Sequence, residues 1–182
     1  MDGPASSRYL RRALLWLVTT SAVYLLLNGA QIFETAVIVP AWTAAPPESL
    51  GMFQGKFGLD FKIFWIVFHS LHEITFIAAL IVSWRLKEIR RWMLALLVIH
   101  IAVRVWTIAY FAPTIIAFQG MPYAATVDPA LVERAARWRN LNIIRVLLFF
   151  ALNAALLVPV YRVARMLCGG SRDSPPVASG HR

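Results

Sequence analysis

Residues 61–84 read FKIFWIVFHSLHEITFIAALIVSW. A transmembrane helix needs about 20 mostly apolar residues to cross a hydrocarbon core of about 30 Å, and this segment has that length and composition. Its middle nevertheless contains His69, His72 and Glu73. The segment therefore predicts a membrane-spanning helix that carries polar side chains at mid-membrane depth.

Three further segments share this length and apolar composition, at residues 13–39, 92–112 and 141–161. The chain of 182 residues is 59% hydrophobic and 15% charged, whereas soluble globular chains are about 45–50% apolar and about 25% charged. The single cysteine, Cys168, excludes an internal disulfide framework and a Cys-x-x-Cys site. We predict one all-α membrane domain over residues 13–168, a four-transmembrane-helix antiparallel bundle.

Basic residues indicate the orientation of this bundle. They are Arg8, Arg11 and Arg12 before the first span, Arg85, Lys87, Arg90 and Arg91 between the second and third, and Arg162, Arg165 and Arg172 after the fourth. Cytoplasmic loops carry an excess of Lys and Arg, so we expect both termini in the cytoplasm and a multi-pass protein of the cell (inner) membrane. Residues 1–12 would be a cytoplasmic N-terminus and residues 169–182 a disordered cytoplasmic tail. The net charge of +9 lies in short clusters between apolar runs rather than on one folded face, so no nucleic-acid partner is expected.

The first outer loop carries a helix start signal at residues 47–49, Pro-Glu-Ser. It predicts a short interfacial helix with Leu50, Phe53 and Phe57 on one side.

Three prolines mark expected helix boundaries. Asp128 followed by Pro129 is typical of a helix start and predicts a helix that leads into the fourth span. Pro40 and Pro113 are expected at helix ends or kinks, because proline lacks the N–H that would continue the helix.

Each span also contains polar side chains that are costly in hydrocarbon. They are Asn28, Gln31 and Glu34 in the first span, His69, His72 and Glu73 in the second, His100 and Arg104 in the third, and Asn142, Arg145 and Asn153 in the fourth. Helical spacing places those of each span along one edge. We expect the four edges to face one interior site that opens on the non-cytoplasmic side and ends near mid-membrane.

Three interpretations of this site are open. In the first, His69, His72, His100 and Glu73 are ligands of a transition metal, iron or copper. Haem between two of these histidines fits less well. In the second, the three histidines are general bases, while Arg104 and Arg145 stabilise an oxyanion. Aromatic side chains (Trp65, Phe68, Trp106, Phe111 and Phe149) would then line a cavity for a flat substrate that enters from the lipid. In the third, Glu73–Arg104 and Glu34–Arg145 are ion pairs that only fix helix register.

Residues 137–145, RWRNLNIIR, carry a family resemblance. A tryptophan followed by asparagine four residues later and arginine three residues after that, at the opening of the last helix, resembles the small four-helix membrane proteins related to anthrone oxygenases. The polar first helix and the Phe111–Pro113 segment are similar too. The resemblance implies oxygenation of a tricyclic aromatic anthrone to the quinone without flavin or nicotinamide. Trp138, Asn142 and Arg145 are the motif positions; the three histidines match no family pattern.

Together these features predict an integral membrane oxidoreductase, an oxygenase acting on an apolar aromatic or quinone-like substrate. Gln31, Glu34, Trp138 and Asn142 are expected to bind a cofactor. The expected partners are membrane lipid and the apolar small molecule, and a homo-oligomer is left open. The alternative is a non-catalytic membrane protein that binds a small ligand or assists a transporter.

Overall fold

The computed structural model describes residues 4–169, and this part of the chain is helical with no strand. The elements are α1 (Pro4–Phe33), the π-helical η1 (Glu34–Ile38), α2 (Val39–Thr43), the 3-10 helix η2 (Glu48–Phe53), α3 (Lys62–Val82), α4 (Lys87–Trp106), the π-helical η3 (Thr107–Phe111), α5 (Ala112–Gln119) and α6 (Pro129–Gly169). The predicted all-α class is confirmed. The predicted disordered tail lies outside the described residues, apart from Gly169.

Four continuous helical segments are long and apolar enough to cross a membrane: Ser6–Thr43, Lys62–Val82, Lys87–Gln119 and Pro129–Gly169. Each also presents apolar side chains on its outer surface, for example Leu25, Ile74, Val98 and Leu147, all at least 60% exposed. In water such a surface would be unfavourable, whereas hydrocarbon solvates it. The predicted number of helices long and apolar enough to cross a membrane, four, is confirmed.

Three of the four helical segments extend beyond the predicted spans. The first begins at Pro4, the third continues to Gln119, and the fourth begins at Pro129 rather than near residue 141. The apolar run measures only the part of a helix that hydrocarbon can surround, so it underestimates the total length. The predicted start of the last helix is confirmed, because Asp128 Oδ1 accepts hydrogen bonds from the backbone N–H of Ala130 at 2.8 Å and of Leu131 at 3.4 Å.

The sequence predicted helix ends or kinks at Pro40 and Pro113, and in the structure neither proline ends its helical segment. Both helical segments continue through these prolines by way of a π-turn, in which Val39 N–H donates to Glu34 O and Ala112 N–H donates to Thr107 O. Proline cannot donate to the carbonyl four residues earlier, and its ring clashes with that carbonyl. One additional residue in the turn accommodates the proline without ending the helix.

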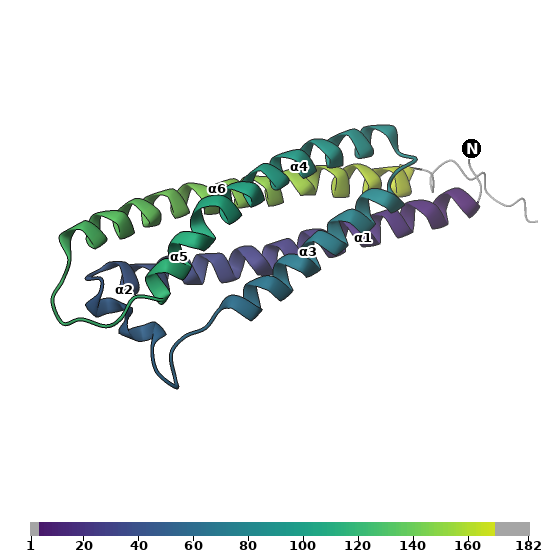
Figure 1. The fold of residues 1–182 in the computed structure, drawn as a ribbon. Coiled ribbons are helices and arrows are strands. Elements are labelled where there is room, and N and C mark those ends of the chain that lie inside the picture. Colours follow the sequence, from purple (N-terminus) through teal and green to yellow (C-terminus); the bar gives the residue numbers. More distant parts are fainter. Residues whose placement is uncertain (1–3, 170–182) are drawn as a thin grey trace, which may run out of the picture.

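The long helices pack lengthwise (Figure 1). Helix α1 lies against α3 and α6, and α4 lies against α6. The start of α1, the loop at residues 83–86 and the end of α6 gather at one end, where the Tyr9 hydroxyl accepts from Arg85 N–H at 3.2 Å and Arg162 pairs with Glu88 at 3.2 Å. The opposite end holds α2, η2, α5 and the start of α6.

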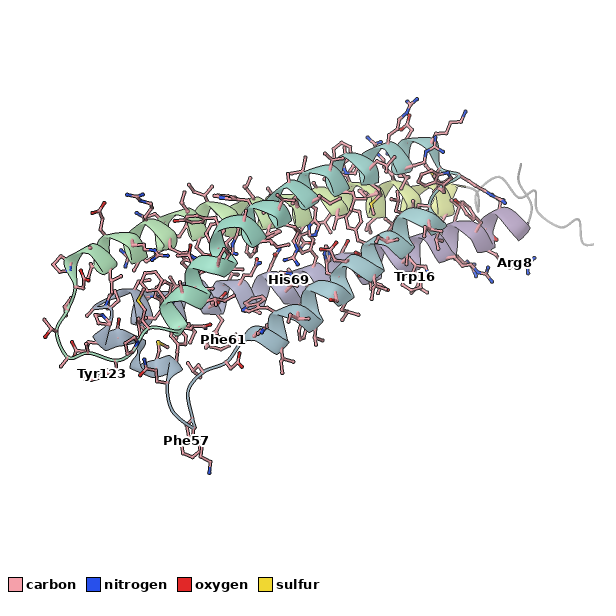
Figure 2. The ribbon with its side chains drawn as sticks, in the orientation of Figure 1. Arg8, Trp16, Phe57, Phe61, His69 and Tyr123 are labelled. Carbon is pink, nitrogen blue, oxygen red and sulfur yellow. The ribbon has the colours of Figure 1, made fainter. Side chains whose placement is uncertain are left out.

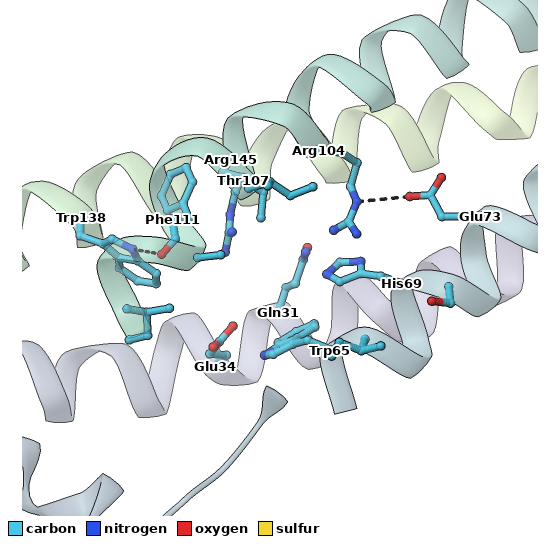
Figure 3. Close-up of a pocket in the computed structure, with 15 residues that line it drawn as sticks. Gln31, Glu34, Trp65, His69, Glu73, Arg104, Thr107, Phe111, Trp138 and Arg145 are labelled. Atoms are coloured by element: carbon cyan, nitrogen blue, oxygen red, sulfur yellow. Dashed lines mark hydrogen bonds and ion pairs between the residues drawn. The ribbon is translucent and has the colours of Figure 1, made fainter. Parts of the chain in front are cut away.

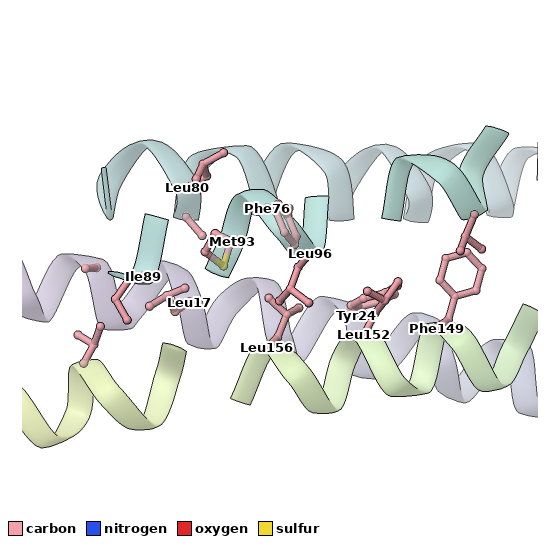
Figure 4. Packing of buried hydrophobic residues seen from close by; sticks show 14 residues of the cluster. Leu17, Tyr24, Phe76, Leu80, Ile89, Met93, Leu96, Phe149, Leu152 and Leu156 are labelled. Carbon is pink, nitrogen blue, oxygen red and sulfur yellow. The ribbon is translucent and has the colours of Figure 1, made fainter. Parts of the chain in front are cut away.

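Two separate apolar clusters fill the bundle. The first, which we call the terminal cluster, contains Leu17, Ile89, Met93 and Leu156 among others and lies toward the end with the chain termini (Figure 4). The second, which we call the loop cluster, is Val39, Trp42, Leu50, Phe111, Phe118, Ala135 and Trp138. His72 and His100 pack on aromatic members of the terminal cluster, Tyr24, Phe76 and Phe149, whereas Arg145 lies over Phe111 of the loop cluster.

The short helix expected in the first loop is present as η2 (Glu48–Phe53), and both Leu50 and Phe53 pack in the loop cluster. Leu50 is fully buried in the loop cluster, whereas Phe57 is 91% exposed and projects from the tip of the following loop (Figure 2). The η2 segment is therefore held by packing against α2 and α5 and does not present the predicted common apolar surface.

Neighbouring leucines on α6 allow a direct test of the terminal cluster. Leu156 is 1% exposed and Leu157 is 57% exposed. Leu156→Ala should lower the free energy of unfolding by about 2–5 kcal/mol, because it leaves a cavity among packed side chains. Leu157→Ala should have little effect, because its side chain already faces outward. Thermal unfolding of both variants in the same detergent measures the difference, and equal effects would contradict this packing.

Candidate functional site

A cavity of about 340 Å³ lies between the four long helical segments (Figure 3). Its lining comprises Gln31 and Glu34 from the first segment, Trp65, Ile66, His69, Ser70 and Glu73 from α3, Arg104, Thr107, Ile108, Phe111, Ala112 and Ile115 from the third segment, and Trp138 and Arg145 from α6. Small-molecule sites typically have volumes of about 300–1,000 Å³ and largely apolar walls with a few polar groups. The cavity has the properties of such a site.

One wall carries an ion pair between neighbouring helices. Arg104 Nε lies 3.2 Å from Glu73 Oε1, and this pair was predicted from the sequence. The terminal nitrogens of the Arg104 guanidinium point into the cavity, toward Gln31 and His69 (Figure 3). Glu73 thus neutralises part of the arginine's charge while leaving its outer donors directed at the cavity.

Arg145 lies on the opposite wall and is 8% exposed. Its Nη2 donates to Asn142 Oδ1 at 2.6 Å, and its guanidinium lies over the Phe111 ring, 4.3 Å from the centroid. Asn142 in turn donates to Thr35 Oγ1 at 3.0 Å. Asn142 is not among the residues that line the cavity. Its contribution is to hold Arg145 in place through this hydrogen bond.

The predicted ion pair between Glu34 and Arg145 needs correction. Both side chains line the cavity, but the structure records no ion pair between them. Glu34 lies beside the indole of Trp65 (Figure 3), whereas Arg145 lies over Phe111. The two side chains therefore lie against different aromatic rings of the cavity lining and form no direct ion pair.

The three predicted histidines have different positions. His69 lines the cavity with its ring stacked on Trp65, 5.4 Å between centroids, and no described residue forms a hydrogen bond with its nitrogens. His72 and His100 lie deeper and are only 1% and 2% exposed. His100 Nε2 lies 3.1 Å from Glu73 Oε1, and its Nδ1 lies 3.3 Å from the Tyr24 hydroxyl.

This arrangement does not fit the predicted metal centre. Among the described residues, no group of three or more His, Cys, Asp or Glu side chains is placed to hold a metal ion. His69 faces the cavity, whereas both ring nitrogens of His100 are engaged by protein groups. The ring centroids of His72 and His100 are 4.9 Å apart, which leaves no space for a haem plane between them. The predicted ligands do not converge on a common point.

Two fully buried polar atoms of the cavity side chains have no hydrogen-bond partner among the described residues. They are Gln31 Oε1, an acceptor, and Arg145 Nε, a donor, and neither atom has a hydrogen-bond partner. Gln31 is 2% exposed and Arg145 is 8% exposed. A buried unpaired polar group costs about 1–3 kcal/mol. Both atoms have almost no accessible surface, so a ligand in the cavity would reach them only after a neighbouring side chain moved.

The cavity opens sideways between α3 and η3. Ile66, Ser70 and Ile108 line it and are at the same time exposed on the outer surface, Ile66 by 56% and Ile108 by 66%. Such side chains mark the mouth of a cavity. This mouth lies on the apolar flank that lipid would contact, and the opening toward the non-cytoplasmic side stays a prediction.

The ionisable side chains that line the cavity, Glu34, His69, Glu73, Arg104 and Arg145, were all predicted from the sequence. Of the five aromatic residues expected to line the cavity, Trp65 and Phe111 do so. The role of Tyr24 as a partner of His100 was missed, although Tyr24 lies four residues before Asn28 on the same polar edge. The mouth residues were missed because isoleucine and serine in a span carry no distinguishing signal.

Comparisons with protein-family models, with curated proteins and with solved structures find no match to this chain. The resemblance to proteins related to anthrone oxygenases therefore rests on the motif residues and stays a prediction.

The support of Arg145 by Asn142 can be tested against a nearby asparagine. Asn142→Leu removes the only side-chain acceptor recorded for Arg145 in the described chain, so the free energy of unfolding should fall by about 2 kcal/mol. Asn140→Leu changes an exposed asparagine on the same helix and should have little effect. Unfolding by titration with a denaturing detergent measures both variants. Similar midpoints for the two would show that this hydrogen bond does not stabilise the fold.

Proposed function

We propose that this chain is an integral membrane oxidoreductase of the anthrone-oxygenase type, which oxidises a flat, apolar, oxygen-bearing aromatic substrate in the cavity. The observation that carries the proposal is the presence of an unpaired histidine, His69, and two arginine side chains around one aromatic-walled cavity with a mouth on the apolar flank.

The walls suit such a substrate in size and chemistry. Trp65, Phe111 and Trp138 supply flat apolar faces, and aromatic groups pack favourably on one another. The mouth at Ile66 and Ile108 would admit a molecule dissolved in the hydrocarbon. A substrate oxygen would then meet the donors of Arg104 or Arg145.

The proposed reaction begins with proton transfer. His69 takes a proton from an acidic C–H group of the substrate, and the electron pair of that bond moves toward the ring carbonyl oxygen. Arg104, whose terminal nitrogens point into the cavity, stabilises the resulting enolate oxygen.

Dioxygen is the oxidant in this proposal. The deprotonated carbon forms a bond to dioxygen and yields a peroxide after protonation. The O–O bond then breaks, water leaves with the second hydrogen of the carbon, and a carbonyl group remains. In total, one dioxygen is consumed, a CH2 group becomes C=O, and one water is released. The protein's residues supply the base and the donors, and no metal or organic cofactor enters the balance.

The membrane arrangement belongs to the same proposal. We place the four segments antiparallel in the cell (inner) membrane with both termini in the cytoplasm, because the end that holds the termini and the loop at residues 83–86 also carries the basic clusters. The cavity then lies between mid-membrane and the outer leaflet.

A non-catalytic ligand-binding or transport-accessory protein is the second candidate. It is favoured by the pairing of Glu73 with both Arg104 and His100, since these charged groups have partners without any substrate. It predicts binding without turnover.

Replacement of His69 separates the two candidates. With anthrone as the probe, the wild-type protein in lipid nanodiscs should consume dioxygen and form the quinone, followed by absorbance. His69→Gln should lower the rate about 100-fold or more, because a general base contributes about 10²–10⁴-fold. Lys62→Gln alters an exposed side chain on the same helix and should leave the rate unchanged.

Two results would contradict the oxidoreductase proposal. Anthrone that binds to the wild-type protein without dioxygen uptake would support the ligand-binding candidate. Turnover that His69→Gln leaves intact would show that another group takes the proton.

The single cysteine tests the orientation. Cys168 is exposed at the end of α6, so a membrane-impermeant maleimide should label it only after cells are made permeable. In a Cys168→Ser background, Lys56→Cys in the exposed first loop should be labelled on intact cells. The reverse pattern would overturn the orientation.

A further inference from the structure

A line of hydrogen bonds leads from the cavity wall into the centre of the bundle. Arg104 Nε is 3.2 Å from Glu73 Oε1, His100 Nε2 is 3.1 Å from the same oxygen, and the Tyr24 hydroxyl is 3.3 Å from His100 Nδ1. Three helices contribute, α1 with Tyr24, α3 with Glu73 and α4 with the other two. We call these four residues the Tyr24–Arg104 chain.

The donors and acceptors of this chain can be assigned. Arg104 Nε can only donate, so the carboxylate of Glu73 accepts from it. The same carboxylate oxygen then also accepts from His100 Nε2–H. In a neutral imidazole the other nitrogen is an acceptor, and His100 Nδ1 therefore accepts from the Tyr24 hydroxyl. With a neutral imidazole, the donors of the chain thus converge on the Glu73 carboxylate, from Tyr24 through His100 on one side and from Arg104 on the other.

The inner end of the chain is fixed by close packing. Tyr24 and His100 are 1% and 2% exposed. Phe76 and Phe149 pack on the His100 ring, with centroids 6.2 and 6.0 Å away, and Phe149 also packs on Tyr24 at 6.0 Å. The imidazole has little freedom to rotate, so it holds the Glu73 carboxylate at a defined place.

His72 provides an internal comparison. It is as buried as His100, and its ring lies 4.1 Å from Tyr24 and 4.9 Å from His100. Its Nε2 nevertheless has no hydrogen-bond partner, and no hydrogen bond joins its side chain to Glu73. Burial and ring contact are thus shared by the two histidines, whereas the hydrogen bond to Glu73 belongs to His100.

We propose that Tyr24 and His100 are positioning residues that act through Glu73 to hold the Arg104 guanidinium at the cavity. The inference rests on the proposed function, because the oxyanion that Arg104 would stabilise arises in that reaction. A donor directed at a developing charge is effective only when its position is fixed beforehand. Neither Tyr24 nor His100 lines the cavity, so neither is expected to contact the substrate.

Four variants test this role: Tyr24→Phe, His100→Leu, His100→Gln and, as the matched control, His72→Gln. Tyr24→Phe keeps the ring and removes only the hydroxyl. The side-chain amide of His100→Gln can still donate to Glu73, which His100→Leu cannot. The two readouts are kcat and KM for anthrone oxidation and the infrared carboxylate band of Glu73, identified by its loss in Glu73→Gln.

Tyr24→Phe and His100→Leu should lower kcat about tenfold with a small change in KM, because removal of transition-state stabilisation lowers kcat. Both should also shift the Glu73 band. His100→Gln should recover most of the wild-type kcat, and His72→Gln should leave the band in place. The isosteric Tyr24→Phe variant keeps the test decisive if His100→Leu does not fold.

Unchanged kcat and an unchanged Glu73 band in Tyr24→Phe and His100→Leu would overturn the inference. The same loss in His72→Gln as in His100→Leu would also overturn it, since the effect would then be one of packing. If the wild-type protein does not oxidise anthrone, the proposed function fails. The infrared band of Glu73 then remains as the only test of the Tyr24–Arg104 chain. A band shifted by Tyr24→Phe but not by His72→Gln would then still support the chain, and an unshifted band would reject it.

Discussion

Polar groups within hydrocarbon have no water to bind, and this constraint determines how the four helical segments meet. Glu73 on α3 has two partners on α4, Arg104 and His100, and the latter is bonded to Tyr24 on α1. Asn142 on α6 joins Arg145 to Thr35 of η1. Glu73 and Asn142 are thus each hydrogen-bonded to a neighbouring helical segment, so rotation or sliding of these segments would break the hydrogen bonds.

The two π-turns have a direct part in forming the cavity. Glu34 begins η1 and lines the cavity, and Thr107 and Phe111 are the first and last residues of η3 and also line it. A π-turn inserts one additional residue and so changes which side chains face inward beyond it. The indole of Trp138 donates to Phe111 O at 3.2 Å, which ties α6 to the end of η3. Pro40 and Pro113, where the sequence predicts helix ends or kinks, thus lie within continuous helical segments whose π-turns contribute side chains to the cavity.

The sequence was sufficient for features that depend on local pattern, namely four apolar spans, the capped start of α6 and the Glu73–Arg104 pair. It was insufficient where rotation about a helix axis decides. At about 100° per residue, His69 and Glu73 are about 40° apart, whereas His72 and Glu73 are about 100° apart. All three count as one polar edge, yet His69 and Glu73 reach the cavity while His72 turns to Tyr24. Whether the polar edge of a helix faces one neighbouring helix or two depends on how the helices pack, and the sequence pattern carries no information about that packing.

The packing between the cavity and the end of the bundle that holds the chain termini bears on the choice between catalysis and transport. Leu17, Ile89, Met93 and Leu156 are almost fully buried in the terminal cluster and lie between the helices on the side of the chain termini (Figure 4). A solute that crossed the bundle would have to displace these close-packed side chains, and protein interiors yield little. The mouth at Ile66 and Ile108 requires no such displacement. A molecule would therefore enter and leave the cavity by the same apolar flank, an arrangement that suits chemical conversion or sequestration of a lipid-soluble compound better than its passage across the membrane.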